Sequence, residues 1–556
     1  MKRHVLLVVI VTVACSCFST LLTAAPTEVK GDKGDAQSWL DRARLAASRD
    51  RHGVSIFYYG QALAADSTIG PGIGKELGDQ YTWADKPDSA VAWYELYLDH
   101  HPDDIDAELG LARALSWSNQ LDDALTHYRR LLVRSPGREI EVRTAIARVT
   151  SWQDRLEDAL AIYDSVLAES PDNLDARIGR AQATNWSGKH REAAVLYSEL
   201  LAAHPGNTEI RSGLAQAYRW MDRPDLAMDV LDITPRHASH EEIAGSIQRE
   251  RSPTVSYAFN SNEDSDDIER RRHEFRGGLS SGYLTRSHAI FSHWKITQPG
   301  RPELERDQLR GSLEKRFSTQ LALSATAGYE WNQFNRAALG PETFWKDEHN
   351  LFTLDGYLTL TPRDWVRADL GLFRGSLDNP EPVFRGITVT ELSLGTDYRF
   401  RPTMVAFGGG SFADYSDDNN RFTVSGRLTW NPIYQAPVGV RNRFTSSTYV
   451  GYLTFDRQLD HGYFSPSEYI TLYERLQWDL NFDDVVHLIV AGRIGPEREG
   501  SGDWFWVGSM DGLASWQMLR DFSITLGYYN SRSRLETRSG YQADGWYLTL
   551  GYLFAR

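Results

Sequence analysis

The chain of 556 residues has little cysteine, no long apolar run after its start, and a deficit of positive charge. Its two cysteines, Cys15 and Cys17, both lie in the opening segment, so the rest of the chain has no thiol and no disulfide framework. After that segment, no stretch is apolar enough for a transmembrane helix. The formal net charge of −15 excludes nucleic acid as an expected partner, because phosphate binding needs a basic surface.

The opening segment has the pattern of a secretory signal peptide. A basic start precedes an apolar run over residues 6–14, and small residues at 23–25 form a cleavage region. The apolar run is too short to span a bilayer. We therefore expect residues 1–25 to be a signal peptide and residues 26–35 to be a linker. A lipoprotein signal, acylated at one of the two cysteines, is the alternative.

Residues 36–235 carry an internal repeat of 34 or 35 residues. A tryptophan and an alanine seven positions later recur five times, and four of these units add a tyrosine and a closing proline at fixed offsets. The tryptophans are Trp83, Trp117, Trp152, Trp186 and Trp220, and the alanines are Ala90, Ala124, Ala159, Ala193 and Ala227. This period, with small residues at fixed points and a terminal proline, resembles the tetratricopeptide repeat, a pair of antiparallel helices. The resemblance implies about six helix pairs, the first of them degenerate.

The repeated tryptophan lies near the end of the first helix of each pair, a position that faces the concave groove in this family. One interpretation is that each indole fills the interface between neighbouring units. The other is that the five indoles form a ladder that stacks on sugar rings. Arg113 and Arg148 precede Trp117 and Trp152 by about one helical turn, which suits a polar groove and also plain solubility. These two arginines and the five tryptophans are the candidate groove residues.

After a polar bridge over residues 236–252, which we expect to be a linker, the hydrophobic period changes to two. Apolar residues alternate with small or polar ones in "LALSATAGYEW" (321–331), and "FTLDGYLTL" (352–360) and "WYLTLGYLF" (546–554) follow the same pattern. Leu and Val occupy the middle of one face, with aromatic residues at its ends. Ser, Thr, Gly and charged residues occupy the other face. This arrangement predicts a transmembrane β-barrel over residues 253–556.

Sixteen strands are expected, an even number that places both ends of a barrel on one rim. They lie near 254–261, 271–284, 287–297, 305–317, 320–334, 348–361, 365–376, 387–400, 403–414, 420–431, 440–455, 468–482, 485–494, 503–518, 521–531 and 541–554. Short connections alternate with long ones, as in outer-membrane barrels with short periplasmic turns. The predicted fold is therefore α + β and multidomain: a periplasmic helical repeat solenoid followed by an antiparallel barrel of about 16 strands.

Ionisable residues recur at the expected inward positions of these strands, with acids and bases nearly balanced. They are Glu274, Arg276, Arg310, Glu314, Arg316, Glu330, Asp355, Arg367, Asp369, Glu391, Asp397, Arg399, Arg421, Arg427, Arg475, Asp479 and Arg493. They form either a wall of cross-strand ion pairs that keeps the tube rigid and hydrated, or a wet channel that passes a polar polymer through weak contacts. The two roles are compatible.

Glu474 departs from this alternation because it falls on the expected lipid face, between Leu472 and Leu476. A charged side chain there is costly. We therefore expect either a bulge that shifts the register of this strand or a second surface that covers the carboxylate.

The sequence contains no convincing catalytic or metal-binding motif. "GLSSG" (278–282) matches the serine-hydrolase pattern Gly-x-Ser-x-Gly, but it lies inside an expected strand and not at a strand-to-helix turn. The 15 histidines show no metal-ligand spacing. We therefore expect no enzymatic activity, no metal and no cofactor.

The order of parts resembles that of the exopolysaccharide export porins of the poly-N-acetylglucosamine and cellulose systems. It also resembles the YaiO-type outer-membrane barrel family, whose repeats carry an Ala-Arg…Trp first helix, present here as "ARALSW" (112–117) and "ARVTSW" (147–152). These resemblances imply an outer-membrane barrel with periplasmic repeats that passes a polysaccharide outward. The implied partners are outer-membrane lipid, a polysaccharide, and periplasmic or inner-membrane assembly proteins that bind the repeats. The alternative is a non-conducting envelope scaffold or surface receptor that binds proteins through the repeats.

Overall fold

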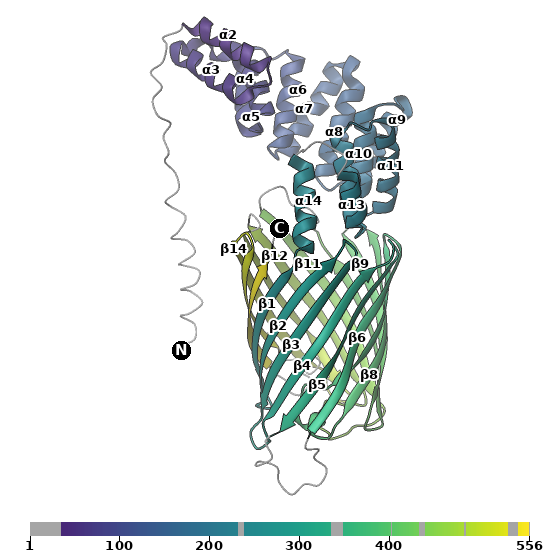
Figure 1. Ribbon diagram of the computed structural model, residues 1–556. Coiled ribbons are helices and arrows are strands. Elements are labelled where there is room, and N and C mark those ends of the chain that lie inside the picture. Colours follow the sequence, from purple (N-terminus) through teal and green to yellow (C-terminus); the bar gives the residue numbers. More distant parts are fainter. Residues whose placement is uncertain are drawn as a thin grey trace. The chain divides into compact units, whose positions relative to one another are not determined.

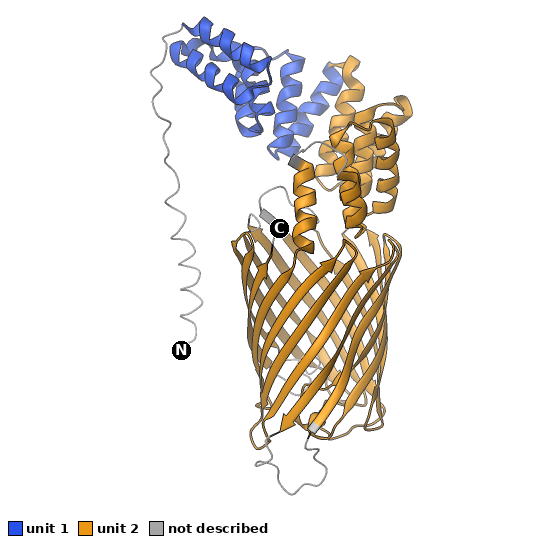
Figure 2. Ribbon diagram, viewed as in Figure 1, with its two compact units in different colours: residues 1–134 blue, residues 135–556 orange. Residues whose placement is uncertain are grey.

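The computed structural model describes residues 35–231, 238–334, 348–401, 403–432, 440–482, 485–531 and 543–554. The chain forms two compact units, residues 1–134 and 135–556 (Figure 2). The expected signal peptide and all but the last residue of the expected linker after it lie outside the described residues. None of the helices that the structure describes combines the length and the apolar character needed to cross a membrane.

The first unit contains three helix pairs. They are α2 (Ala36–Ala47) with α3 (His52–Ala65), α4 (Gly70–Trp83) with α5 (Pro87–His100), and α6 (Ile105–Trp117) with α7 (Leu121–Arg134). Short polar side chains start the first helices: Asp35 accepts from the Ser38 N–H, and Asp104 accepts from the Ala107 N–H.

The second unit begins with three more pairs and one additional helix. They are α8 (Glu139–Trp152) with α9 (Leu156–Glu169), α10 (Leu174–Trp186) with α11 (His190–Ala203), and α12 (Thr208–Trp220) with α13 (Pro224–Leu231), followed by α14 (Ala238–Arg251). Two residues after each repeated tryptophan, the backbone turns into the left-handed region. Asp85, Asn119, Asp154, Gly188 and Asp222 occupy these positions. Asp, Asn and Gly tolerate this conformation best, which explains the sharp end of each first helix.

The repeated alanine and tyrosine make the close contacts within the repeats. All five alanines are fully buried. The ring of Tyr163 lies against Gly179, where an added Cβ would come within 2.4 Å of it, and Tyr197 covers Gly213 in the same way. Glycine is therefore required at these positions by close approach and not by backbone conformation.

The described part of the bridge that the polar composition predicts to be a linker, residues 238–252, is mostly the helix α14. α14 packs against α12 and α13, and its Ile247 is fully buried beside Met228 and Leu231. Ile243 is the neighbouring apolar contact, one turn earlier on the same face. An apolar stripe this narrow in a polar segment is too weak to be recognised from periodicity alone.

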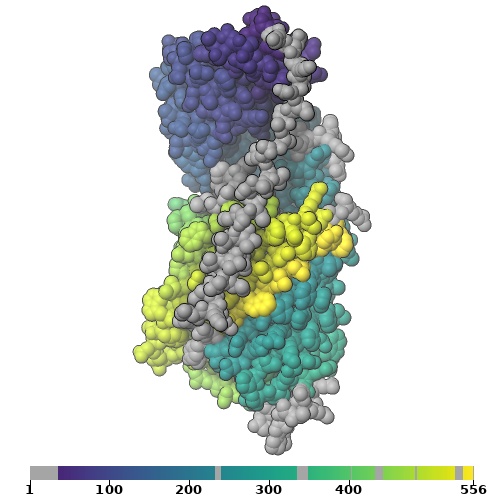
Figure 3. Space-filling model, turned by 90° about the vertical axis from the view of Figure 1, so that its left-hand side faces the viewer, coloured from purple at the N-terminus to yellow at the C-terminus, as the bar shows by residue number. Residues whose placement is uncertain are grey.

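The strands that follow α14 form a closed antiparallel barrel, which confirms the predicted fold class. They are β1 (Thr254–Asp264), β2 (Glu269–Ser281), β3 (Thr285–Thr297), β4 (Leu304–Arg316), β5 (Leu321–Phe334), β6 (Glu348–Arg363), β7 (Val366–Ser376), β8 (Thr388–Arg401), β9 (Met404–Tyr415), β10 (Asn419–Trp430), β11 (Val440–Phe455), β12 (Tyr469–Phe482), β13 (Val486–Glu499), β14 (Phe505–Leu519), β15 (Phe522–Ser531) and β16 (Ala543–Leu553). Each strand pairs with its neighbours in sequence, and β16 pairs with β1 over the full length of β1 (Figures 1 and 3).

The two faces of the barrel wall differ as the alternation predicts. Large apolar side chains such as Leu309, Leu392 and Val450 are about half exposed and face outward. Polar and charged side chains occupy the alternate, inward positions. A short α-helix, α15 (Pro380–Phe384), lies in the connection between β7 and β8.

Glu474 lies on the outward face, and no register shift brings it inward. β12 keeps the same register with β13 on both sides of Glu474, and it pairs regularly with β11. The expected bulge is therefore wrong for this strand. Instead, Thr448 Oγ1 donates to Glu474 Oε2 at 2.6 Å, and the Ser446 hydroxyl donates to the other carboxylate oxygen. Two hydroxyls on β11 thus satisfy a carboxylate that faces the apolar exterior.

Candidate functional site in the barrel lumen

The ionisable residues selected from the sequence all lie on the inward face, opposite the exposed apolar side chains of their own strands. Most of those with resolved ion pairs contact partners on the lumen wall. The N–O distances are 3.2 Å for Arg276–Glu274 and Arg310–Glu274, 2.9 Å for Arg367–Asp369, 2.7 Å for Arg421–Glu391, 3.6 Å for Arg427–Asp397 and 2.8 Å for Arg475–Asp511. These pairs hold acids and bases around a polar wall. A conducting role for these residues stays a prediction.

The other selected residues have varied surroundings on the same face. Asp479 contacts His487 at 2.6 Å, and Arg493 Nε donates to Ser509 Oγ at 3.1 Å. Glu330 is almost fully buried beside Arg306. Arg316 lies at the rim that carries the repeats and pairs with Asp222. Glu314, Asp355 and Arg399 lie on the same inward face.

Two connections at the rim opposite the start of β1 fold into the lumen, because they contact inward-facing residues of the wall and each other. We call residues 377–387, between β7 and β8, inner loop 1. We call residues 456–468, between β11 and β12, inner loop 2. Both are long connections, which the sequence places at this rim but not inside the barrel. Their inward course is the main feature that the sequence analysis missed.

Inner loop 1 is held to the wall by buried charged groups. Arg306 Nη2 donates to Leu377 O at 2.7 Å, and its Nη1 lies 3.3 Å from Asp378 Oδ1. Arg306 is only 1% exposed, and Glu330 beside it is equally buried. The Ser376 hydroxyl, at the start of the loop, donates to Glu330 at 2.6 Å. Loss of Arg306 would leave the Glu330 carboxylate buried without a cation and would remove the contacts to Leu377 and Asp378, so this arginine ties the loop to the wall.

Apolar contacts hold the far half of inner loop 1. Val383 and Phe384 of α15 are fully buried against Ile268, Ile296 and Leu304 of the wall. These two side chains give the signal that sequence analysis could have used, because adjacent large apolar residues are unusual in an exposed polar loop.

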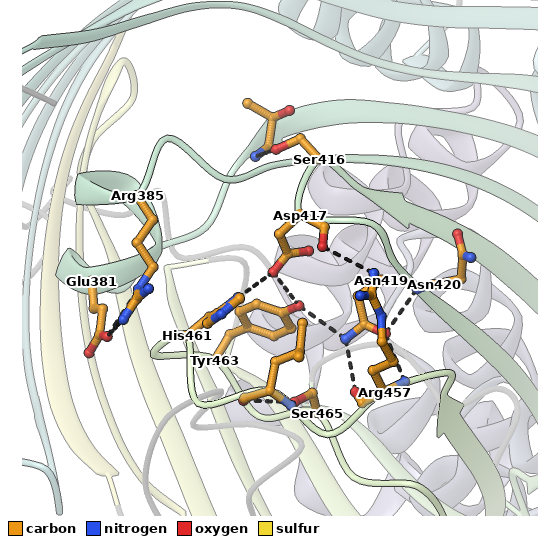
Figure 4. A network of polar contacts seen from close by, with 12 residues as sticks. Glu381, Arg385, Ser416, Asp417, Asn419, Asn420, Arg457, His461, Tyr463 and Ser465 are labelled. Carbon is orange, nitrogen blue, oxygen red and sulfur yellow. Dashed lines mark hydrogen bonds and ion pairs between the residues drawn. The ribbon is translucent and has the colours of Figure 1, made fainter. Parts of the chain in front are cut away.

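Inner loop 2 is held by a polar network centred on Asp417 and Asn419, at the turn between β9 and β10 (Figure 4). The Tyr463 hydroxyl donates to Asp417 Oδ2 at 2.9 Å, and His461 Nδ1 lies 2.8 Å from the same oxygen. Asn419 Nδ2 donates to Arg457 O at 3.0 Å, while its Oδ1 accepts from Arg457 N at the same distance. Burial raises the pKa of Tyr463, and so does the hydrogen bond to Asp417, so the hydroxyl stays protonated and donates.

The two inner loops contact each other. Asn379 Nδ2 donates to Gly462 O at 2.8 Å. Gly462 has φ +77°, and a Cβ at this position would lie 2.5 Å from Glu381. Only glycine satisfies both the backbone conformation and the close approach. The inner loops therefore form one connected structure.

The repeated tryptophans have different surroundings. Trp83, Trp117 and Trp220 are exposed by 39% or more, and Trp152 is partly exposed. The Trp220 ring lies 5.2 Å from the His190 ring, and Trp83 stacks on His52 at 6.3 Å, so both pack against the start of a preceding helix. These contacts favour the interpretation in which the indole fills the interface between neighbouring units.

Trp186 is placed differently. It lines a polar cavity of about 500 Å³ within the last repeats, together with Gln182 and Arg249. This position favours the interpretation in which the indole faces a groove. Arg113 is exposed and Arg148 is partly exposed. A glycan-binding role for these residues stays a prediction.

Neither the serine-hydrolase pattern nor a metal-binding cluster is formed among the described residues. The "GLSSG" segment spans the end of β2 and the following turn, so it does not form a strand-to-helix elbow. Among the residues that the structure describes, no group of three or more His, Cys, Asp or Glu side chains could hold a metal ion.

The helices and strands together define the class: tetratricopeptide repeats followed by a 16-strand antiparallel β-barrel. The tetratricopeptide repeat family model matches residues 84–149 and 187–249. No curated protein sequence matches the chain.

Solved structures with similar parts share little sequence with the chain. A bacterial polysaccharide outer membrane secretin is 12% identical with a TM-score of 0.42, over 55% of this chain and 99% of that one. A tetratricopeptide repeat protein from Parabacteroides merdae is 17% identical with a TM-score of 0.32, over 38% and 85% of the two chains. A thermophilic tetratricopeptide repeat protein from Thermus thermophilus is 23% identical with a TM-score of 0.29, over 32% and 98%.

Proposed function

We propose that this protein lies in the bacterial outer membrane, with its repeats in the periplasm, and that its barrel passes a polysaccharide outward. The carrying observation is the wall of the closed barrel, which is apolar outside and lined inside by paired acids and bases such as Arg475–Asp511 and Arg421–Glu391. An uncharged polar polymer can exchange weak hydrogen bonds with such a wall without being trapped by a field of one sign. We further propose that the repeats bind periplasmic or inner-membrane assembly proteins.

Single-channel recording tests the passage function. We expect the purified full chain to form pores in planar bilayers, and we expect neutral gluco-oligosaccharides to interrupt the current briefly. Oligosaccharides that are added from either side and leave the current unchanged would contradict passage of a polysaccharide.

A non-conducting scaffold or receptor is the second candidate function. It is favoured by the inner loops, because Asn379 and Gly462 connect them inside the lumen. A barrel that stays silent under all applied voltages, while the repeats still capture envelope proteins, would support this alternative.

The proposed orientation has its own test. Both ends of a barrel with an even number of strands lie on one rim, so the repeats and the last strand share a compartment. We expect trypsin to spare the repeats on intact cells and to degrade them after the outer membrane is permeabilised. Loss of the repeats from intact cells would place them outside.

A further inference from the structure

A cavity of about 280 Å³ lies where the inner loops meet the barrel wall. Its lining includes Glu391 and Arg421 of the wall and two aromatic residues of inner loop 2, Tyr463 and Phe464, which we call the inner-loop aromatics. Its aromatic lining comes from Phe373 on β7, Tyr415 on β9, Phe455 on β11, and Tyr463 and Phe464 on inner loop 2. The Tyr415 and Tyr463 rings stack at 5.0 Å, which fixes one wall. The volume is near the lower end of small-molecule sites, which hold about 300–1,000 Å³.

An ion pair supplies the polar part of this cavity. Arg421 Nη2 donates to Glu391 Oε2 at 2.7 Å, and about a quarter of each side chain is exposed. The pair spans β9 above Ala413, because Glu391 and Arg421 both pair with that residue. Arg421 Nε is buried and has no hydrogen-bond acceptor among the described residues. The exposed part of the guanidinium keeps N–H donors beyond the one given to Glu391, and these are left for a ligand.

The same arrangement recurs six residues along each strand with an aromatic residue in the place of Ala413. Asp397 and Arg427 pair across β9 above Phe407. The Arg427 guanidinium lies 5.3 Å from the centre of the Phe407 ring, a contact that an alanine cannot offer to Arg421. The two ion pairs therefore differ in the side chain that lies beneath the arginine.

The lining matches the chemistry of a sugar ring. A pyranose has a face of C–H groups, which pack on the negative face of an aromatic ring, and an edge of hydroxyls, which both donate and accept hydrogen bonds. The Arg421–Glu391 pair offers a donor and an acceptor with no net charge. A neutral sugar is therefore favoured over a uronate, whose carboxylate would lose its hydration without gaining a free counter-charge, because Arg421 is already paired with Glu391.

We propose that this cavity is a binding subsite for one neutral pyranose unit of a polysaccharide in the lumen. The proposal deepens the proposed passage function, on which it rests for the identity of the polymer. Phe373 and the inner-loop aromatics hold the ring face, and Arg421 and Glu391 bind the hydroxyls. The subsite lies beside the inner loops, so a polymer would be held where the lumen narrows.

Calorimetry on the detergent-solubilised full chain tests the subsite directly, with cellohexaose and N-acetylglucosamine hexamer as neutral probes and oligogalacturonate as the acidic probe. We expect a neutral probe to bind the unmodified protein. Phe373→Ala should weaken its binding about tenfold, the effect of losing one ring contact. Arg421→Lys should weaken binding similarly, because lysine lacks the planar fork of donors.

The Asp397–Arg427 ion pair and the Phe407 ring beneath it provide matched controls. Phe407→Ala and Arg427→Lys change the same residue types on the same inward face, and we expect them to leave binding within about twofold. Heat-dependent gel mobility confirms that each variant is folded. Equal binding in all variants would overturn the subsite, and so would the absence of neutral binding or a preference for oligogalacturonate.

Bilayer recording of the same variants separates this proposal from the passage function. Conductance without Phe373-dependent binding would retain passage and overturn the subsite. A silent barrel with Phe373-dependent binding would overturn passage and retain the subsite.

Discussion

At the scale of single residues, Glu474 is the clearest conflict between the sequence and its surroundings. A charge on the lipid face costs about 2–4 kcal/mol for a cation at the bilayer midplane, and less for a carboxylate. Two hydroxyls offset part of this cost, because they donate hydrogen bonds to the carboxylate oxygens. The alternation of the strand identified the residue from sequence. Its partners could not be predicted, because they depend on the register between β11 and β12.

Replacing Glu474 by glutamine tests whether the charge itself destabilises the barrel. The amide side chain keeps an acceptor for Thr448 and removes the charge, so we expect Glu474→Gln to raise the free energy of unfolding by about 1 kcal/mol. Urea unfolding in lipid vesicles, followed by tryptophan fluorescence, measures this difference. Asp479→Asn, on the inward face beside His487, is the control and should not stabilise the barrel. A less stable Glu474→Gln variant would indicate that the charge is used by a partner.

At the scale of elements, the two periodicities predict most of the fold. Strand alternation predicts sixteen strands because each strand has one apolar and one polar face. It also predicts which ionisable residues face inward. The inner loops could not be predicted, because a connection with little regular structure carries no period. The cavity could not be predicted either, since Phe373, Tyr415 and Tyr463 are far apart in sequence.

Within the repeats, Gly179 gives a sharp test of helix packing. An added Cβ would lie 2.4 Å from the Tyr163 ring, so we expect Gly179→Ala to destabilise the repeats by about 1–3 kcal/mol. Thermal melting followed by circular dichroism at 222 nm measures the loss. Gly60→Ala in α3 is the control: nothing lies within 4 Å of its added Cβ, and the change should stabilise by up to about 1 kcal/mol. Equal effects of the two changes would show that helix propensity, and not packing, dominates.

The buried Arg306–Glu330 pair beneath inner loop 1 allows a test of whether this loop limits the width of the lumen. Arg306→Gln leaves Glu330 buried without its charged partner, a cost of about 3–5 kcal/mol that release of the loop would relieve. We therefore expect a larger single-channel conductance. The double variant Arg306→Gln with Glu330→Gln has no unpaired carboxylate at position 330, and its conductance should return toward that of the unmodified protein. Identical conductance in all three proteins would mean that inner loop 1 does not limit the pore.

At the scale of the whole molecule, the second unit joins repeat helices to the barrel rim through specific polar contacts. Arg191 Nη2 donates to the carbonyl oxygens of Thr319 and Thr361, at 2.8 and 2.6 Å. Thr319 lies in the turn between β4 and β5, and Thr361 lies near the end of β6. The Asp364 carboxylate accepts from the Arg191 N–H at 2.8 Å, so the barrel supplies the cap for the first turn of α11. This short segment therefore couples the repeats of this unit to the barrel, in addition to the Arg316–Asp222 pair.

His190, next to Arg191, makes this coupling sensitive to pH. Burial lowers the pKa of His190 to about 4, while Asp364 raises it and Arg399 and Arg191 lower it. Once the segment unfolds, histidine returns to its ordinary pKa of about 6.5 and binds a proton more readily. The unfolded state therefore gains protons as the pH falls from 6.5 to 4, and stability is lost across that window. Above pH 6.5 this contribution is constant.

Thermal melting of the repeats between pH 4 and pH 7.5 measures the effect in the full chain. We expect the free energy of unfolding to fall by up to about 3 kcal/mol as the pH is lowered through this window, the equivalent of the shift in the pKa of His190. His190→Gln keeps a side chain that can hydrogen-bond to Asn185 and cannot be protonated, so it should flatten the dependence. His52→Gln is the matched control, because His52 also starts a helix and stacks on a repeated tryptophan. If His190→Gln retained the full slope, protonation of His190 would not be the cause of the acid sensitivity.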